Sequence, residues 1–421
     1  MVAFPSSALL KNRLNFGLLL IVFLLQGRAL AGDNETVLTA KLNRLRAPSS
    51  FPGFSVSVVG EDRVFYQRSF GYADLRRKVP YTVNTAQPIA SVSKTFIAVA
   101  LMRAISEGLF TLETPVSDLL PFKIANPNFP NSPIKVIHLV THTSGIVDQE
   151  AYKKSYLFAE DADQHTPLHR YLKREGYGGN RTDTKLAGFL RAYLGRSGRW
   201  YQPSNFGKKK PGIEYQYSNI ASALTAYLIE VKTGRSFADY TRKTIFEPLG
   251  MKDTYWVVEP RGGESAAPRA RLYSDSAEEY PAYSSATYPD GSLVTSNQDL
   301  SRYLREMIRG YKGRSALLPK QAFQMMFAPK FSGGQPPEGL PANLPNSGVF
   351  WAYTRNGNIG HTGGDLGVTT LITLSPRTGT GRIFIANSDL DSRGVMNARA
   401  VRQLKAIWKA LEAYEAETND R

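Results

Sequence analysis

The segment from residue 91 to residue 107 constrains the fold most, because it has the composition of a helix without a polar face. Every position from Phe96 to Met102 is apolar. A helix that is apolar all round is buried in a protein interior. The rest of the chain must therefore pack around this helix. A chain of 421 residues is long enough to do so as two lobes, or as one large unit with an insertion.

Strand-like segments lie at both ends of the chain. Near the beginning, Phe54, Val56 and Val58 alternate with other residues, and a turn at residues 60–62 leads to a second strand over residues 63–70, which predicts a hairpin. Near the end, residues 350–355, 368–374 and 382–386 are strand-like, with turns that contain glycine and proline between them. A final helix has one apolar face, marked by Val401, Leu404, Trp408 and Leu411.

Between these strands, residues 110–275 have mostly helical patterns, including a helix over residues 221–231 that Gly234 ends. We therefore predict an α/β (α+β) fold, with one antiparallel sheet built from both chain ends, flanking helices and an inserted, mostly helical lobe. The predicted sheet lobe covers residues 32–85 and 280–421, and the helical lobe covers residues 86–279, within a single unit over residues 32–421. Residues 329–347 are predicted to form a loop near the rim of a cleft.

The first 31 residues have the order of a secretory signal peptide. Lys11 and Arg13 give a basic start, residues 14–25 form an apolar run, and Ala29-Leu30-Ala31 places small residues at the positions that determine cleavage. The alternative is an uncleaved membrane anchor, but the run is shorter than the roughly 20 apolar residues of a spanning helix. We predict cleavage before Gly32 and an exported protein, periplasmic or secreted.

The cysteine content and the net charge exclude some kinds of chemistry and indicate possible partners. The chain has no cysteine, which excludes disulfides, thiol catalysis and cysteine metal sites. Its formal charge is +16, and removal of the three basic residues Lys11, Arg13 and Arg28 with the leader leaves +13. A positive excess favours anionic surfaces. An exported protein meets cell-wall polymers or lipid rather than nucleic acid, so no nucleic-acid partner is expected; simple solubility is the alternative explanation of the charge.

The start of the buried helix carries the first chemical motif, Ser91-Val92-Ser93-Lys94, which has the form Ser-x-x-Lys. Residues three apart share a helix face, so the Lys94 ammonium is expected beside the Ser91 hydroxyl. A serine hydroxyl needs a base to take its proton, and a buried lysine can act as one. The free N–H groups of a helix N-terminus can also stabilise an oxyanion. The alternative is an ordinary helix start with Ser91 as its N-cap.

Two further motifs follow along the chain. Tyr217-Ser218-Asn219 precedes a helix. It supplies either a helix cap, or a phenol that moves protons together with an amide that orients Lys94 or the substrate. His361-Thr362-Gly363-Gly364 comes just before a predicted strand. It is either a glycine-rich turn or a strand edge along which a substrate lies, with backbone N–H groups that face the cleft.

The three motifs, in this order, resemble those of the serine β-lactamase and penicillin-binding-protein family, above all the class C β-lactamases and the related DD-peptidases and esterases. Residues 138–145, 246–251 and 291–294 are similar to the same family. The resemblance extends from about residue 54 to residue 387. It implies a β-lactamase/transpeptidase-like fold and a serine hydrolase that uses no cofactor and no metal.

The resemblance also implies a role for each residue of the first two motifs. Ser91 is expected to be the nucleophile that the substrate acylates. Lys94 and Tyr217 are expected to share the general-base and general-acid work, without a fixed division between them, and Asn219 is expected to orient its neighbours. The backbone N–H groups of Ser91 and Gly364 are expected to form the oxyanion hole.

The last motif departs from the common pattern of the family. His361, Thr362, Gly363 and Gly364 are expected to lie along the substrate. Many related β-lactamases have a lysine at the position of His361, which holds a substrate carboxylate with a full charge. A histidine with an ordinary pKa near 6.5 is mostly neutral at neutral pH, and Gly364 lacks the hydroxyl that many members place there. For both reasons we expect the protein to hydrolyse β-lactams less efficiently.

Two other stretches have sequences that resemble this last motif. Lys232-Thr233-Gly234 ends a helix, where lysine and glycine are ordinary capping residues. His142-Thr143-Ser144-Gly145 precedes the tyrosine motif, so its order in the chain is wrong, and we expect it to stabilise a loop. No Gly-x-Ser-x-Gly occurs, which excludes the nucleophile elbow of an α/β-hydrolase.

Residues 147–211, here called the basic insertion, form a longer segment than the family pattern predicts. The segment is either a wall of the cleft that selects substrate or a solvated helical insertion, and it is the candidate contact for an anionic surface. Its aromatic residues include Trp200, Tyr201 and Phe206. Its basic residues include Lys153, Lys154, Arg170, Lys173, Arg174, Arg181, Arg196, Arg199, Lys208, Lys209 and Lys210.

The sequence therefore predicts an exported serine hydrolase that cleaves amide or ester bonds through an acyl-enzyme on Ser91, in the manner of a DD-peptidase, amidase or esterase. Its expected partner is a small-molecule or peptide substrate, with a cell-wall peptide as one candidate. The alternatives are a β-lactamase proper and a non-catalytic peptidoglycan binder that keeps the fold. An intact set of Ser91, Lys94, Tyr217 and Asn219 argues against the binder.

Overall fold

The computed structural model describes residues 34–46, 51–160, 165–179, 185–259, 268–331 and 336–419. The predicted signal peptide, residues 1–31, and Arg181 of the basic insertion lie outside the described residues. Among the described residues, no helix combines the length and the apolar character that a membrane span requires.

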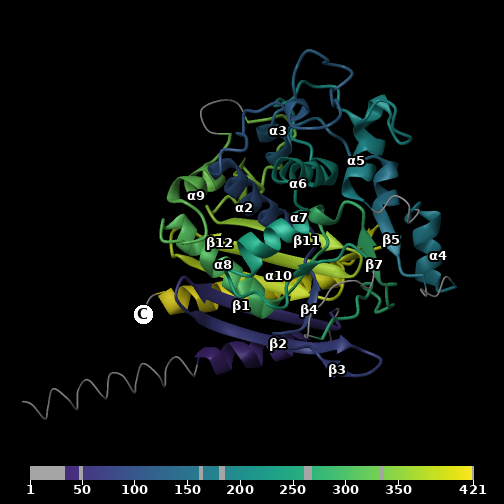
Figure 1. The fold of residues 1–421 in the computed structure, drawn as a ribbon. Helices are drawn as coiled ribbons and strands as arrows, with labels where there is room; N and C mark the ends of the chain where they lie inside the picture. The colour runs from purple at the N-terminus through teal and green to yellow at the C-terminus, as the bar shows by residue number, and fades with distance from the viewer. Residues whose placement is uncertain are drawn as a thin grey trace, which may run out of the picture.

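An eight-stranded antiparallel sheet joins the two ends of the chain, as Figure 1 shows by the purple strands beside the yellow ones. The strand order is β3-β2-β1-β13-β12-β11-β10-β9. The first two strands form the predicted hairpin, and β1 also pairs with β13, so that Val56 lies opposite Phe384. The bounds are β1 Gly53–Gly60, β2 Val64–Asp74, β3 Val79–Pro80, β9 Asn346–Ser347, β10 Ala352–Tyr353, β11 Ile359–Asp365, β12 Val368–Ser375 and β13 Thr380–Ala386.

One face of this sheet is covered by the two terminal helices, residues 34–46 and α10 (Ala398–Asn419). The alternation predicted for residues 54–59 places Phe54, Val56 and Val58 on this face. Leu404 and Leu411 of α10 pack there as predicted. The buried residues of this layer include Leu38, Leu42, Phe54, Val56, Val58, Phe384, Leu404, Ile407 and Leu411.

The other face of the sheet borders the larger core, which is built around α2 (Ser93–Ser106). The residues from Phe96 to Met102 are all buried there, as the apolar composition predicted. The remaining helices are α3 Val136–Val140, α4 Pro167–Arg174, α5 Leu186–Leu194, α6 Asn219–Thr233, α7 Phe237–Thr241, α8 Asn297–Tyr311 and α9 Lys320–Phe327. The short strands are β4 Ala86–Pro88, β5 Tyr156–Phe158, β6 Tyr255–Trp256, β7 Tyr283–Ser285, β8 Leu293–Ser296, β14 Asp391–Ser392 and β15 Val395–Met396.

Three local predictions need correction. The predicted helix over residues 91–107 begins as a short 3₁₀ turn, η1 (Ala90–Val92), before α2. The strand predicted over residues 350–355 shortens to β10, because Phe350 has a φ of 53° and cannot continue an extended strand. The motif that starts at His361 lies inside β11 rather than before a strand, since the residues of β11 pair in register with β12.

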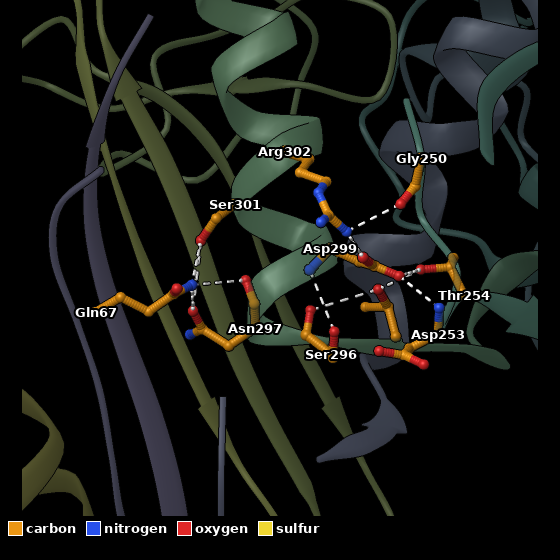
Figure 2. Close-up of polar contacts among 10 residues, drawn as sticks. Gln67, Gly250, Asp253, Thr254, Ser296, Asn297, Asp299, Ser301 and Arg302 are labelled. Atoms are coloured by element: carbon orange, nitrogen blue, oxygen red, sulfur yellow. Dashed lines mark hydrogen bonds and ion pairs between the residues drawn. The ribbon is translucent and has the colours of Figure 1, made fainter. Parts of the chain in front are cut away.

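A polar network fixes the segment that leads into α8 (Figure 2). The carboxylate of Asp299, in the first turn of α8, accepts hydrogen bonds from Asp253 N–H at 2.7 Å and from the Thr254 hydroxyl at 3.0 Å. Arg302 pairs with the same carboxylate at 2.6 Å and donates to the Gly250 carbonyl at 2.9 Å. These bonds anchor α8 and with it β8, which begins three residues after Asp290.

Candidate active site

Ser91 lies in the turn η1, directly before the buried helix α2. The residue before it, Ala90, is buried and has a φ of 47°, in the left-handed region that alanine seldom adopts. The Ile89 N–H donates to the Leu293 carbonyl at 3.0 Å, which ties the turn to β8. Strained backbone of this kind persists where surrounding structure enforces it, often at functional positions. Ser91 itself is half-buried, so its hydroxyl is accessible.

The side chain of Lys94 is fully buried and is surrounded by oxygen atoms from three parts of the chain. Its Nζ lies 3.0 Å from Ser91 Oγ, 2.7 Å from Asn219 Oδ1 and 2.6 Å from the main-chain oxygen of Asp290. A lysine ammonium has three N–H donors, and each of these oxygens can accept one. The contact predicted from the Ser-x-x-Lys spacing is therefore present, and so is the orienting contact from Asn219.

Tyr217 faces the cleft at the start of α6. Its side chain is 38% exposed, and Lys94 Nζ lies 5.2 Å from the centre of its ring. Ser218 is the N-cap of α6, because its hydroxyl accepts the Ala221 N–H at 3.0 Å. The two interpretations of the Tyr217-Ser218-Asn219 motif are thus combined: Ser218 caps the helix, and its two neighbours reach the site.

Asp148 also holds this helix start, a role that no sequence pattern predicted. One carboxylate oxygen accepts the Asn219 N–H at 2.7 Å, and the other accepts the Ile220 N–H at 3.1 Å and the Ser218 hydroxyl at 2.8 Å. Burial raises the pKa of Asp148, while these hydrogen bonds and the charge of Lys94 lower it. The available signal was an acidic residue just after the stretch at residues 142–145.

His142 contacts the tyrosine motif, so the stretch expected to stabilise a loop also lies beside the site. Its ring centre lies 4.3 Å from that of Tyr217, and its Nδ1 accepts the Ser218 N–H at 3.2 Å. Burial holds the pKa of His142 well below its usual range, and the charges of Lys94 and His361 act in the same direction. A neutral ring therefore packs against Tyr217. The position of residues 142–145 before the tyrosine motif argued against a role in the site. Order along the chain gives no information on which residues meet in the folded protein.

Strand β11 runs past the nucleophile turn. A Cβ at Gly363 would lie 2.4 Å from the Ile89 carbonyl oxygen and 3.2 Å from the Ser91 nitrogen, so only glycine allows this approach. A Cβ at Gly364 would meet no atom within 4 Å, and Gly364 and Thr362 are exposed. The structure thus places the predicted substrate strand beside Ser91, while the oxyanion hole of Ser91 and Gly364 stays a prediction.

His361 lies on the same strand, two residues before Gly363. Its ring centre is 6.5 Å from that of Tyr217, and its Nδ1–H donates to the Thr362 carbonyl at 2.6 Å. Burial is the main cause that lowers the pKa of His361 to about 4, and the charge of Lys94 adds to it. The ordinary pKa near 6.5 that the sequence suggested is therefore too high. His361 is neutral at pH 7, with Nε2 as the free acceptor.

Two tyrosines of the basic insertion contact aspartates that lie near Lys94. Tyr152 donates to Asp290 Oδ2 at 3.2 Å, and Tyr156 donates to Asp365 Oδ1 at 2.8 Å. Burial raises the pKa of Asp290 to about 7 and raises that of Asp365. Part of the segment thus packs against residues near Lys94, while its role as a wall that selects substrate stays a prediction. Within the described residues, no group of three or more acidic or histidine side chains is placed to hold a metal ion.

The chain belongs to the β-lactamase family, since the Beta-lactamase family model matches residues 38–406. Protein flp of Staphylococcus aureus (strain MW2) is 23% identical over 359 residues, 85% of this chain and 64% of that protein, so the chain spans less than two thirds of this relative.

Two solved structures have the same fold. The octameric penicillin-binding protein homologue from Pyrococcus abyssi has a TM-score of 0.65 and 22% identity, over 90% of this chain and 77% of that chain. D-amino acid amidase from Ochrobactrum anthropi SV3 has a TM-score of 0.64 and 22% identity, over 90% of this chain and 99% of that chain. They confirm the predicted antiparallel sheet with flanking helices.

Replacement of Asp148 by asparagine tests its positioning role. Asparagine offers one acceptor oxygen instead of two, so the N–H groups at the start of α6 lose a charged partner. Hydrogen bonds to charged groups contribute about 1.5–3 kcal/mol. We expect kcat for ester hydrolysis to fall by roughly 10- to 100-fold with little change in KM. Glu150→Gln is the control, because the Glu150 side chain is 85% exposed. Equal kcat values for the two variants would contradict the role.

Tyr217→Phe removes the phenolic hydroxyl and keeps the ring packing against His142. We expect the melting temperature to stay within a few degrees and the rate of Ser91 acylation to fall by about 10²–10⁴-fold, the usual contribution of a positioned acid–base group. Tyr72→Phe is the control, since Tyr72 is 37% exposed on β2 and does not line the cavity beside Tyr217. Unchanged acylation in Tyr217→Phe, measured by stopped-flow with an ester and an amide, would remove Tyr217 from the mechanism.

Proposed function

We propose that the protein is an exported serine hydrolase that cleaves esters or amides through an acyl-enzyme on Ser91. The observation that carries the proposal is the buried Lys94 with Ser91 Oγ at 3.0 Å and Asn219 Oδ1 at 2.7 Å. A binder that had lost catalysis would have no need to keep a buried cation in contact with an accessible serine, since burying a charge is costly. The D-amino acid amidase with the same fold supports the hydrolytic interpretation.

The reaction proceeds in two halves. Before the attack the Lys94–Tyr217 pair is one proton short, as a neutral Lys94 amine or as a Tyr217 phenolate beside the Lys94 ammonium. Ser91 Oγ attacks the substrate carbonyl carbon, the deprotonated member of the pair takes its proton, and a tetrahedral oxyanion forms. The bond to the leaving group then breaks, and the pair returns the proton to the departing oxygen or nitrogen. Water next attacks the Ser91 ester, and the acid is released with Ser91 restored. The backbone N–H groups of Ser91 and Gly364 stabilise the oxyanion in both halves.

The substrate is uncharged near His361. Because the pKa of His361 is lowered to about 4, its charge appears only as the pH falls through about 4, and it is neutral over the whole physiological range. A neutral imidazole offers a carboxylate no ion pair. We therefore infer that neutral esters and amides are better substrates than penicillins. A β-lactamase proper needs its cation from elsewhere, and the basic insertion is one candidate source.

Wild type and His361→Lys should differ in their preference between nitrocefin and a p-nitrophenyl ester. We expect wild type to have the higher kcat/KM on the ester. His361→Lys should lower KM for nitrocefin by about tenfold, because a permanent cation attracts the carboxylate in the ground state and the transition state alike. His165→Lys is the control, since His165 is exposed and lies outside the site. A higher wild-type kcat/KM on nitrocefin would favour the β-lactamase alternative.

A further inference from the structure

A cavity of about 320 Å³ opens beside Tyr217 and His361. It follows the part of β11 before Gly363 and continues under the loop that precedes β9. Its walls come from several elements that lie far apart in the sequence. The residues that matter for its chemistry are Tyr217, His361, Leu344, Phe350, Ala352 and Ile372.

The surface of this cavity is mostly apolar, although the hydroxyl groups of Ser347, Thr354 and Thr373 also border it. Leu344, Phe350, Ala352 and Ile372 contribute hydrocarbon surface, and no aspartate, glutamate, lysine or arginine is among the described residues that line the cavity. Phe350 is held in place by its N–H, which donates to the Val140 carbonyl at 3.1 Å. Such a cavity stabilises uncharged apolar groups and excludes carboxylates, because a charge there would lose its hydration without a partner.

The position of the cavity relative to Ser91 indicates which part of the substrate enters the cavity. The leaving group must receive a proton as its bond to the carbonyl carbon breaks, so its oxygen or nitrogen lies next to the proton donor. Tyr217 belongs both to the acid–base pair and to the cavity wall. The acyl part is then directed away from Tyr217, toward the end of β11 beyond Gly364, where Tyr156 donates to Asp365.

We propose that this cavity is the leaving-group pocket, and that the leaving group is an uncharged apolar alcohol or amine with a short chain or a single ring. The proposal rests on the proposed function and adds the substrate class to it. A volume of about 320 Å³ lies at the lower end of the roughly 300–1,000 Å³ of small-molecule pockets, which suits one chain or ring rather than a polymer segment.

Two series of esters test the proposal, with acid release measured by pH-stat. The first series keeps a propionyl group and varies the alcohol from methyl to butyl and benzyl; the second keeps the methyl alcohol and varies the acyl chain over the same sizes. We expect kcat/KM to rise about fourfold per added methylene in the alcohol, from about 0.8 kcal/mol per buried methylene. When deacylation limits turnover, kcat stays constant through the first series, because all its members give the same propionyl-enzyme.

Two loop variants and one pocket variant make the test specific. Leu344→Asp puts a charge into the wall and should abolish the preference for longer alcohols. Asn343→Asp is the matched control, because Asn343 is the exposed neighbour in the same loop and does not line the cavity. Ala352→Phe should fill the cavity and reverse the preference, so that methyl esters become the best substrates. Melting curves and fluorophosphonate labelling of Ser91 establish that each variant is folded.

The possible results distinguish a failure of the leaving-group pocket from a failure of the proposed serine hydrolase function on which it rests. A dependence on alcohol size that Leu344→Asp removes and Asn343→Asp keeps supports the pocket. A wild-type kcat/KM that follows acyl size and ignores alcohol size overturns the assignment, while normal labelling of Ser91 leaves the serine hydrolase intact. Absence of both ester turnover and Ser91 labelling overturns the proposed function, and the pocket with it.

Discussion

The buried ammonium group of Lys94 is the interaction on which the site depends. Its three oxygen partners come from the nucleophile turn, from the start of α6 and from the segment before β8, at 3.0, 2.7 and 2.6 Å. These segments are far apart in the sequence, and a fully buried cation is stable only while all of them stay in place. The charge of Lys94 therefore couples the packing of the core to the geometry of the site. The network around Asp299 holds β8, and through β8 it supports the segment that contains Asp290.

Strain and burial around this charge are concentrated at the site. Three residues other than glycine with positive φ angles lie at the site. Ala90 precedes the nucleophile, His142 borders Tyr217, and Phe350 lines the apolar cavity. Gly363 meets the nucleophile turn so closely that no side chain fits. Burial and the charge of Lys94 lower the pKa of His361 to about 4, so this side chain presents no charge to a substrate at neutral pH, although the chain as a whole is strongly basic.

Local patterns in the sequence predicted much of the fold and the central pair of residues. The apolar run in α2 and the alternation in β1 report directly on burial, and the spacing of Ser91 and Lys94 reports on a helical face. The contacts that the sequence did not predict are non-local. Asp148 reaches α6 across 71 positions of the chain, from Asp148 to Asn219, and the tilted ring contact of His142 with Tyr217 has no periodic signal. The pKa of His361 depends on burial and on Lys94, which only the folded chain brings together.

The most direct test of the account is the site of covalent trapping. The full chain is treated with a fluorophosphonate, its intact mass is measured, and peptide mapping locates the adduct. The account predicts one adduct per chain, on Ser91, and none on Ser91→Ala. The neighbouring hydroxyls of Ser93 and Ser144 are buried, and each accepts a backbone N–H. An adduct on Ser93 or Ser144, or an unmodified wild-type chain beside a labelled control hydrolase, would contradict the assignment of Ser91 as the nucleophile.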